Sequence, residues 1–223
     1  MRDEYFDYFI GKFGEATSRV AVSSAAISKW RGRLPDQLLR YWEEEGWCSY
    51  ANGLLWTVDP EYYEDLVDEW LADTVLEQVD SFHAFARSAF GDLYLCGEHS
   101  GASVTICCQL NAISVLGSAP RAKSSEKRDA SIQSFFAASA LTDFDLNDDN
   151  GHPLFARALG KLGSLDIDET YGFEPALVLG GAIRLENLSK LDTDVHLTIL
   201  RQLAAPQLPF TAADIEQLLN QPK

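Results

Sequence analysis

The sequence predicts an α+β fold in which an antiparallel β-meander packs against helices, with the chain divided into two subdomains. Short segments rich in β-branched and aromatic residues follow one another between residues 82 and 116, while helical spacing dominates both flanks. A polar stretch separates the two parts at residues 118–130. Hydrophobic residues make up 46% of the 223 residues, enough to form a substantial core.

The first part of the chain predicts helices before the meander. We expect helices over residues 3–13 and 35–45, and short strands over residues 47–50 and 54–58. Pro35 suits the first turn of its helix and Gly46 ends it. Asn52-Gly53 is typical of the tight turn that joins two strands.

The stretch from Asp59 to Asp80 predicts an amphipathic helix. Its apolar residues recur at helical spacing: Tyr62, Tyr63, Leu66, Val67, Trp70 and Leu71. Its other face is acidic: Glu61, Glu64, Asp65, Asp68 and Glu69. Residues 59–80 hold nine acidic residues and no basic one. Two like charges four residues apart on a helix, such as Glu61 and Asp65, destabilise it by roughly a few tenths of a kcal/mol. Either the face is simply solvated, or a basic partner supplies the missing charge.

The meander is expected to comprise four strands: Phe82–Phe90, Asp92–Cys96, Ser103–Cys108 and Ala112–Leu116. The polar stretch that follows, Ser118–Ala130, predicts a linker or an exposed loop. We therefore expect one domain over residues 1–117 and a mostly helical one over residues 131–223.

The second part predicts four helices: residues 131–140, about 153–162, about 194–203, and one from Thr211. The acidic loop at 143–151 invites comparison with a calcium hand, but neither register puts Gly at position 6 and Glu at position 12. We expect its carboxylates to satisfy backbone donors instead.

The charge of the chain argues for a basic partner. The net charge is −16, and residues 1–80 hold 17 acidic against 7 basic residues. Such a surface repels nucleic acid and anionic membranes, and it attracts a cationic protein. The alternative is that the acidity serves only solubility. The stretch Arg121–Arg128 is the single basic feature that would suit a nucleic-acid binder.

Candidate chemistry is sparse, so no enzyme, cofactor or metal is predicted. Cys107 and Cys108 are adjacent in an apolar run and suit buried, reduced thiols better than a metal clamp or disulfide. A hydrolase pairing of either thiol with His83 is the weaker alternative. No phosphate loop, dinucleotide fingerprint or nucleophile elbow occurs. The N-terminus lacks an apolar signal core, so we expect a cytoplasmic protein.

Two segments resemble known families. AFGDLYLCGEHSGASVT (residues 89–105) resembles the strand hairpin of the GAD-like domain. GHPLFARALGKLGSLDIDETYGFEPALVLGG (151–181), followed by LENLSK and HLTILRQL, resembles the C-terminal domain that accompanies it in immunity proteins for type VI secretion DNase effectors. The matching motif residues are Tyr171, Gly172, Glu174, Pro175, Gly180, Gly181, Glu186, Asn187, Lys190 and His196.

The resemblance implies a non-catalytic protein that binds the nuclease domain of its cognate effector and protects the producing cell and its siblings. A DNase presents a basic groove to phosphates, so the acidic face of residues 61–69 is the first candidate interface. Glu174, Glu186 and Asn187 are further candidates, and Trp47 or Trp56 would be apolar anchors. The resemblance leaves two geometries of inhibition: the protein covers the nuclease site, or it binds beside that site and distorts it. The alternative is an interaction or regulatory module with a different client.

Overall fold

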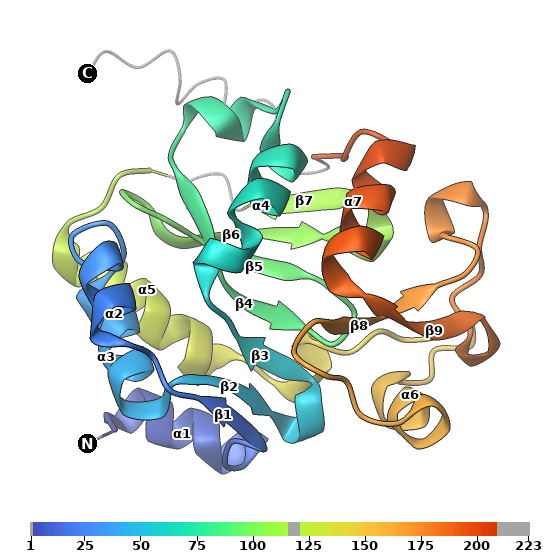
Figure 1. Cartoon of the computed structure of the whole chain (residues 1–223), viewed down its shortest axis with the longest axis horizontal. Coiled ribbons are helices and arrows are strands. Elements are labelled where there is room, and N and C mark those ends of the chain that lie inside the picture. The colour runs from blue at the N-terminus through green and yellow to red at the C-terminus, as the bar shows by residue number, and fades with distance from the viewer. Residues whose placement is uncertain (1, 116–120, 209–223) are drawn as a thin grey trace.

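A seven-stranded antiparallel sheet forms the centre of the molecule (Figure 1). The computed structural model describes residues 2–115 and 121–208. Each strand pairs with its neighbours in sequence, so the sheet is a meander and the α+β class is confirmed. The strands are β1 (Ser18–Val20), β2 (Trp47–Tyr50), β3 (Leu55–Thr57), β4 (Phe82–Ser88), β5 (Leu93–Gly97), β6 (Gly101–Cys107) and β7 (Ala112–Val115).

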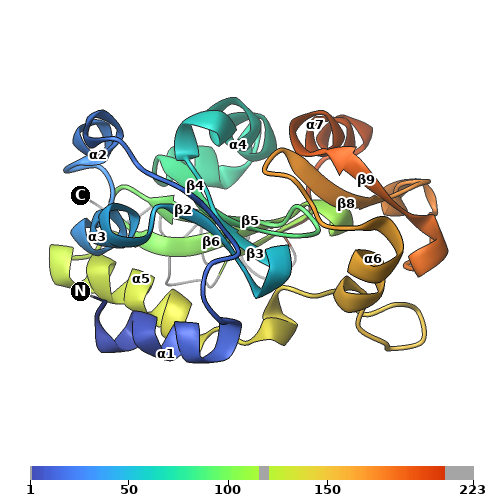
Figure 2. The same cartoon turned by 60° about the horizontal axis from the view of Figure 1, so that its bottom comes forward.

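Helices cover both faces of this sheet. They are α1 (Glu4–Phe13), α2 (Ser24–Trp30), α3 (Asp36–Glu45), α4 (Glu64–Leu71), α5 (Ser125–Ala138), α6 (Phe155–Leu162) and α7 (Thr193–Leu203). Figure 2 shows α1 and α5 on one side of the sheet and α4 and α7 on the other. A second hairpin, β8 (Glu169–Phe173) and β9 (Leu188–Asp192), lies beside the sheet together with α6.

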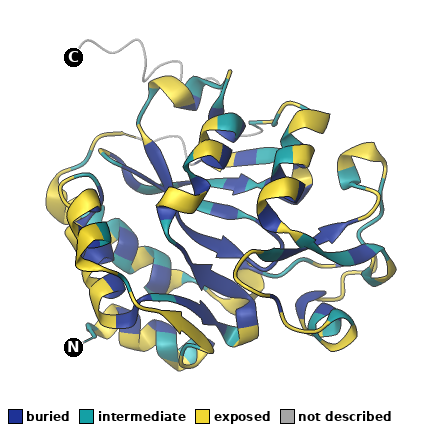
Figure 3. Cartoon of the chain, viewed as in Figure 1, coloured by how far each residue is buried: buried dark blue, intermediate teal, exposed yellow. Residues whose placement is uncertain are grey.

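The core lies around the central strand. All seven residues of β4 are buried, because helices cover the sheet on both faces there (Figure 3). The edge strand β1 is exposed at every residue. The predicted strands at the meander and the Asn52-Gly53 turn are confirmed, whereas β1, α2 and the β8–β9 hairpin were not predicted. These three are short or polar, so their sequences carry little periodicity.

Asp3 ties three helices together at the N-terminus. It caps α1 by accepting from the backbone N–H of Phe6 at 2.9 Å. Its carboxylate also accepts from the Tyr41 hydroxyl of α3 at 2.8 Å and from the Gln133 amide of α5 at 3.1 Å. Beneath it, the rings of Phe6, Phe9 and Phe136 pack within 5.3 Å of one another, centroid to centroid. One carboxylate therefore fixes how α1, α3 and α5 meet.

The expected loop at 118–130 is partly wrong, because α5 already begins at Ser125. Its first turns are polar and exposed, so they lack the apolar spacing that predicts a helix. Tertiary contacts hold them: Asp129 accepts from the backbone N–H of Gln37 at 2.9 Å, and the Arg128 guanidinium donates to the backbone carbonyl of Glu98. Arg128 is thus engaged within the fold, which weakens the nucleic-acid alternative.

Buried polar contacts join the C-terminal elements to the sheet. The N–H of Tyr171 donates to the carbonyl of Ala89 at 2.9 Å, and the Trp70 indole on α4 donates to the carbonyl of Leu197 on α7 at 3.1 Å. The expected helices at 153–162 and 194–203 correspond to α6 and α7. The helix expected from Thr211 lies outside the described residues. Within the described ranges, no helix is long and apolar enough to cross a membrane.

Candidate partner-binding surface

The predicted amphipathic helix is shorter than expected and begins with a separate turn. Pro60–Tyr63 form a 3₁₀ turn that Asp59 caps by accepting from the N–H of Glu61 at 3.1 Å. At Tyr63 the backbone (φ −116°, ψ 0°) leaves helical geometry before α4 starts. This break rotates Tyr62 out of the apolar stripe, so it is 82% exposed, contrary to expectation. The rest of the stripe is buried: Tyr63, Leu66, Val67, Trp70 and Leu71.

Four of the five predicted carboxylates of this face line one hollow, hereafter the acidic groove. Glu64, Asp65, Asp68 and Glu69 form one wall, and Glu77 and Asp80 continue it. The groove has a volume of about 790 Å³. Arg33 and His83 contribute its only basic side chains among the described residues. Glu61 lies outside the groove, on the turn before α4.

Part of the charge compensation missing from residues 59–80 comes from α2. Lys29 lies 3.4 Å from Glu61 and 3.8 Å from Glu64. Glu69 accepts from the Gln202 amide at 3.3 Å. Within the described part of the chain, Asp65 and Asp68 have neither an ion-pair nor a hydrogen-bond partner, and both are exposed. These two carboxylates are therefore the part of the face that stays free for a cation.

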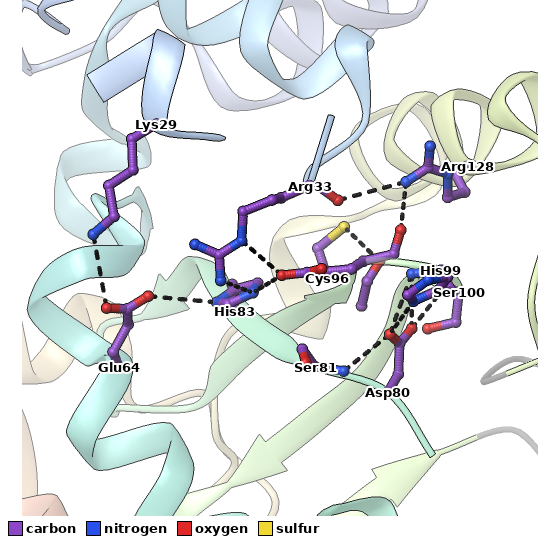
Figure 4. Close-up of polar contacts among 12 residues, drawn as sticks. Lys29, Arg33, Glu64, Asp80, Ser81, His83, Cys96, His99, Ser100 and Arg128 are labelled. Carbon is purple, nitrogen blue, oxygen red and sulfur yellow. Dashed lines mark hydrogen bonds and ion pairs between the residues drawn. The ribbon is translucent and has the colours of Figure 1, made fainter. Parts of the chain in front are cut away.

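A chain of polar contacts connects three residues that line the acidic groove, Arg33, Glu64 and His83 (Figure 4). His83 on β4 contacts the Glu98 carboxylate at 3.1 Å, and Arg33 donates to the same carboxylate at 2.7 Å. Glu64 lies 3.9 Å from the other ring nitrogen of His83. Burial lowers the pKa of His83, which favours the neutral ring. Burial opposes ionisation of Glu98, but the hydrogen bonds from Arg33 and His83 lower its pKa overall.

Asp80 at the edge of the same groove has a structural role instead. Its carboxylate accepts from the backbone N–H groups of Ser81, His99 and Ser100, at 2.9, 3.0 and 2.8 Å. These contacts tie the start of β4 to the turn between β5 and β6 (Figure 4). Since its oxygens are occupied, Asp80 contributes negative potential to the groove rather than a free ligand.

The second group of predicted residues lies elsewhere. Glu174 follows β8 and Glu186 lies in the turn before β9, and both are exposed. Asn187 is used within the fold, because its amide donates to the carbonyl of Ala182 at 3.0 Å. Figure 1 shows α7 between α4 and this segment, so the structure does not bring the two predicted groups together.

Most of the other motif residues make contacts within the fold. The Tyr171 hydroxyl donates to the carbonyl of Gly163 at 2.6 Å, and Lys190 pairs with Glu169 at 2.6 Å. A Cβ at Gly172 would lie 2.3 Å from the His196 ring, and one at Gly181 would lie 2.0 Å from the carbonyl oxygen of Pro175. Contacts within the fold therefore explain why Tyr171, Lys190 and the two glycines occupy these positions.

The two tryptophans expected as apolar anchors differ in where they lie. Trp56 is buried, donates to the carbonyl of Gly53 at 2.8 Å and stacks on Arg87, so it is not a surface anchor. Trp47 is half-buried and lines a second hollow, between β2, the turn before α4 and the start of α7. Sequence reasoning missed the other residues of this hollow, because its walls are more than a hundred residues apart in sequence.

The thiols show no sign of nucleophilic chemistry. Burial raises the pKa of Cys107 to about 12 and that of Cys108 well above its usual range, so neither thiol ionises readily. The strand neighbour of His83 is Cys96, not either residue of the pair. All four cysteines are free. Among the described residues, no group of three or more His, Cys, Asp or Glu side chains is arranged to hold a metal ion.

The carboxylates of the loop at 143–151 satisfy backbone donors, as expected. Asp145 accepts from the N–H groups of Leu146, Leu154 and Phe155, at 2.8, 3.2 and 2.8 Å. Asp148 accepts from two further N–H groups and pairs with Arg157 at 2.6 Å. These contacts shape the entry into α6.

Comparison with known proteins gives two family matches, one in each part of the chain. The family described as GAD-like domain matches residues 4–110, and the family described as T6SS immunity protein Tdi1, C-terminal, matches residues 129–204. The crystal structure of Atu4351 from Agrobacterium tumefaciens is similar in fold, with a TM-score of 0.80, 24% identity and 89% coverage of both chains. No curated protein matches the sequence.

Proposed function

We propose that this chain neutralises a DNase effector by binding its nuclease domain through the acidic groove. The chain joins a GAD-like domain to the C-terminal domain of type VI secretion immunity proteins, which supports an immunity role in that system. The protein then acts by binding alone, in the cytoplasm, and protects the cell that makes the effector and its siblings. The resemblance to DNase immunity proteins supports the choice of target.

The observation that carries the proposal is the pair of unpartnered carboxylates on α4. Asp65 and Asp68 line the acidic groove with no cation of the described chain beside them. A nuclease domain concentrates Lys and Arg where DNA phosphates bind. Opposite potentials speed encounter, and each close charge pair adds to affinity. The groove therefore offers a DNase the same charge pattern that its substrate does.

The proposal predicts that a nuclease effector is encoded beside this gene, and co-purification with that nuclease tests it directly. We expect capture of the toxin and loss of its DNA cleavage. Asp65→Asn with Asp68→Asn should weaken the affinity about tenfold and reduce the salt dependence of binding. The matched control is Glu4→Gln with Asp7→Asn on α1, which removes the same charge from exposed positions on the other side of the sheet. Equal effects of the two double variants would show that only net charge matters.

Competition with DNA separates the two geometries of inhibition. If the acidic groove occupies the DNA site, a catalytically inactive nuclease should bind either a DNA duplex or this protein, but not both. A ternary complex of nuclease, DNA and this protein would instead indicate binding beside the active site. Failure to bind any neighbouring nuclease, together with capture of another protein, would favour the alternative of a module with a different client.

A further inference from the structure

A second hollow, the junction cleft, opens where the sheet meets the C-terminal elements. It has a volume of about 490 Å³. Trp47, Tyr62 and Tyr63 line it from the first part of the chain, and Ile167, Asp168 and Thr193 line it from the second. Unlike the acidic groove, it is lined mainly by apolar and aromatic side chains.

The rim of the junction cleft exposes large apolar side chains from three separate segments. Tyr62 is 82% exposed, Ile167 56% and Val20 45%. Single exposed apolar residues are ordinary, but three that converge on one hollow mark an interaction site. Trp47 is held beside them by an edge-to-face contact with Trp42, with ring centroids 6.0 Å apart.

Four carboxylates share the lining with these apolar side chains. Asp59, Asp168, Asp192 and Asp194 line the cleft, and none of its lining residues in the described ranges is Lys, Arg or His. Burial raises the pKa of Asp59 despite the nearby charge of Lys29, so its ionised form is poorly solvated and would be stabilised by a further cation. Two polar atoms of the lining, Oγ1 of Thr193 and the indole nitrogen of Trp47, are buried without a hydrogen-bond partner in the described chain. The hydroxyl can accept from a guanidinium, whereas the indole N–H donates only to an acceptor such as a peptide carbonyl.

The cleft is preformed rather than dependent on a loop closing. Arg87, fully buried, donates to the carbonyl of Ile167 at 2.9 Å and so fixes the loop that forms one wall. The N–H of Thr193 donates to the carbonyl of Asp168 at 2.7 Å, and Asp192 caps α7 by accepting from the N–H of Val195 at 2.9 Å. A rigid site of this kind loses little entropy when a ligand enters.

We propose that the junction cleft binds an arginine side chain presented by the captured effector, as an anchor separate from the acidic groove. An arginine combines an apolar stem with a planar cation that stacks on aromatic rings and pairs with carboxylates. The aromatic walls and the four carboxylates of the lining match both parts of that side chain. The inference rests on the proposed function, since it names the effector as the source of the arginine.

The cleft itself is tested without the effector by using N-acetyl-arginine methylamide as a probe. In an ¹⁵N-labelled sample, the indole signal of Trp47, assigned with Trp47→Phe, should shift on titration at millimolar probe concentrations. N-acetyl-norleucine methylamide, which lacks the cation, should give a much smaller shift. Asp168→Asn with Asp194→Asn should weaken the arginine response, because it removes two of the four lining carboxylates. The double variant should still fold, because neither side chain makes a hydrogen bond within the described residues. An unmoved Trp47 signal overturns the inference.

Binding of the effector by variants of the cleft tests whether the effector occupies it. Tyr62→Ser should weaken binding of the nuclease about tenfold, whereas Tyr8→Ser, 62% exposed on α1, should leave it unchanged. If the wild-type protein captures the nuclease and both variants do so equally well, the cleft is not used and the proposed function stands. If the probe binds but no nuclease is captured, the proposed function fails and the occupant named here is wrong.

Discussion

Two stretches of this chain are rich in carboxylates: α4 with the turn before it, and the loop at residues 143–151. In the loop, Asp145 and Asp148 together accept from five backbone N–H groups, and Asp148 also pairs with Arg157. On α4, by contrast, no backbone N–H of the described chain bonds the carboxylate of Asp65 or Asp68, and both residues are exposed. The same residue type thus holds a loop together in one place and stays available to a partner in the other.

The comparison teaches that local backbone geometry decides what an acidic cluster does. A loop has unsatisfied N–H groups that a nearby carboxylate satisfies. A helix interior has none, so its exposed carboxylates keep their charge for the solvent or a ligand. Backbone donors use the loop carboxylates, which argues against calcium binding there. The exposed carboxylates of α4 have no such use, which leaves them available to a partner.

The largest expected effect comes from removing the packing beneath α4. Trp70 is fully buried, and its indole donates to the carbonyl of Leu197, so it joins α4 to α7. Trp70→Ala should lower the free energy of unfolding by about 4 kcal/mol, through the cavity and the lost hydrogen bond. Urea denaturation measures this. Trp70→Phe, which keeps most of the volume, should lose about 1–2 kcal/mol; an equal loss in both variants would contradict the packing argument.

Alanine substitutions should distinguish the two acidic clusters through a smaller change in the free energy of unfolding. Asp145→Ala removes the acceptor of three N–H groups and should lower the free energy of unfolding by about 2 kcal/mol. Asp65→Ala, at an exposed site, should change it by less than about 0.5 kcal/mol. Binding to the nuclease should show the reverse order, with Asp65→Ala the more damaging. If the two variants matched in both measurements, the distinction drawn between loop and helix would be lost.

The smallest expected effect is the pH dependence of stability at Asp148. Hydrogen bonds from the N–H of His152 and from Arg157 lower its pKa to about 2. A depressed pKa stabilises the folded protein above the ordinary aspartate pKa, and this contribution is lost as pH falls through about 2. The stability advantage of the wild type over Asp148→Asn should therefore be full above about pH 5 and vanish near pH 2. Urea midpoints measured across this range check it, and an advantage constant with pH would rule out this charge effect.

Strong local signals were enough to predict much of the fold. The strands of the meander, the helix beginning after Pro35 and the buried stripe of Leu66, Val67, Trp70 and Leu71 follow from periodicity and turn residues. Tyr62 broke the pattern because a 3₁₀ turn does not share the angular spacing of the helix that follows it. The start of α5 was missed because its first turns are held by Asp129 and Arg128 through contacts with distant segments.

The candidate surface was predictable in part for the same reason. The acidic face of α4 is a local property of one helix, and four of its five carboxylates share a groove. The pairing of Glu61 and Glu64 with Lys29, and the free state of Asp65 and Asp68, depend on where α2 packs. The junction cleft had no signal, since Trp47, Ile167 and Thr193 meet only when the sheet and the C-terminal elements associate.

The amino-acid sequence by itself determined the class of fold, the excess of negative charge and the helix that displays it, because periodicity, composition and turn chemistry act over a few residues. Only the tertiary structure decided which carboxylates remain free, that Trp56 is buried while Trp47 lines a cleft, and that α4 and the turn before it contribute to two separate hollows. Those outcomes depend on which distant segment supplies each donor, cation or ring, and no local rule specifies that choice.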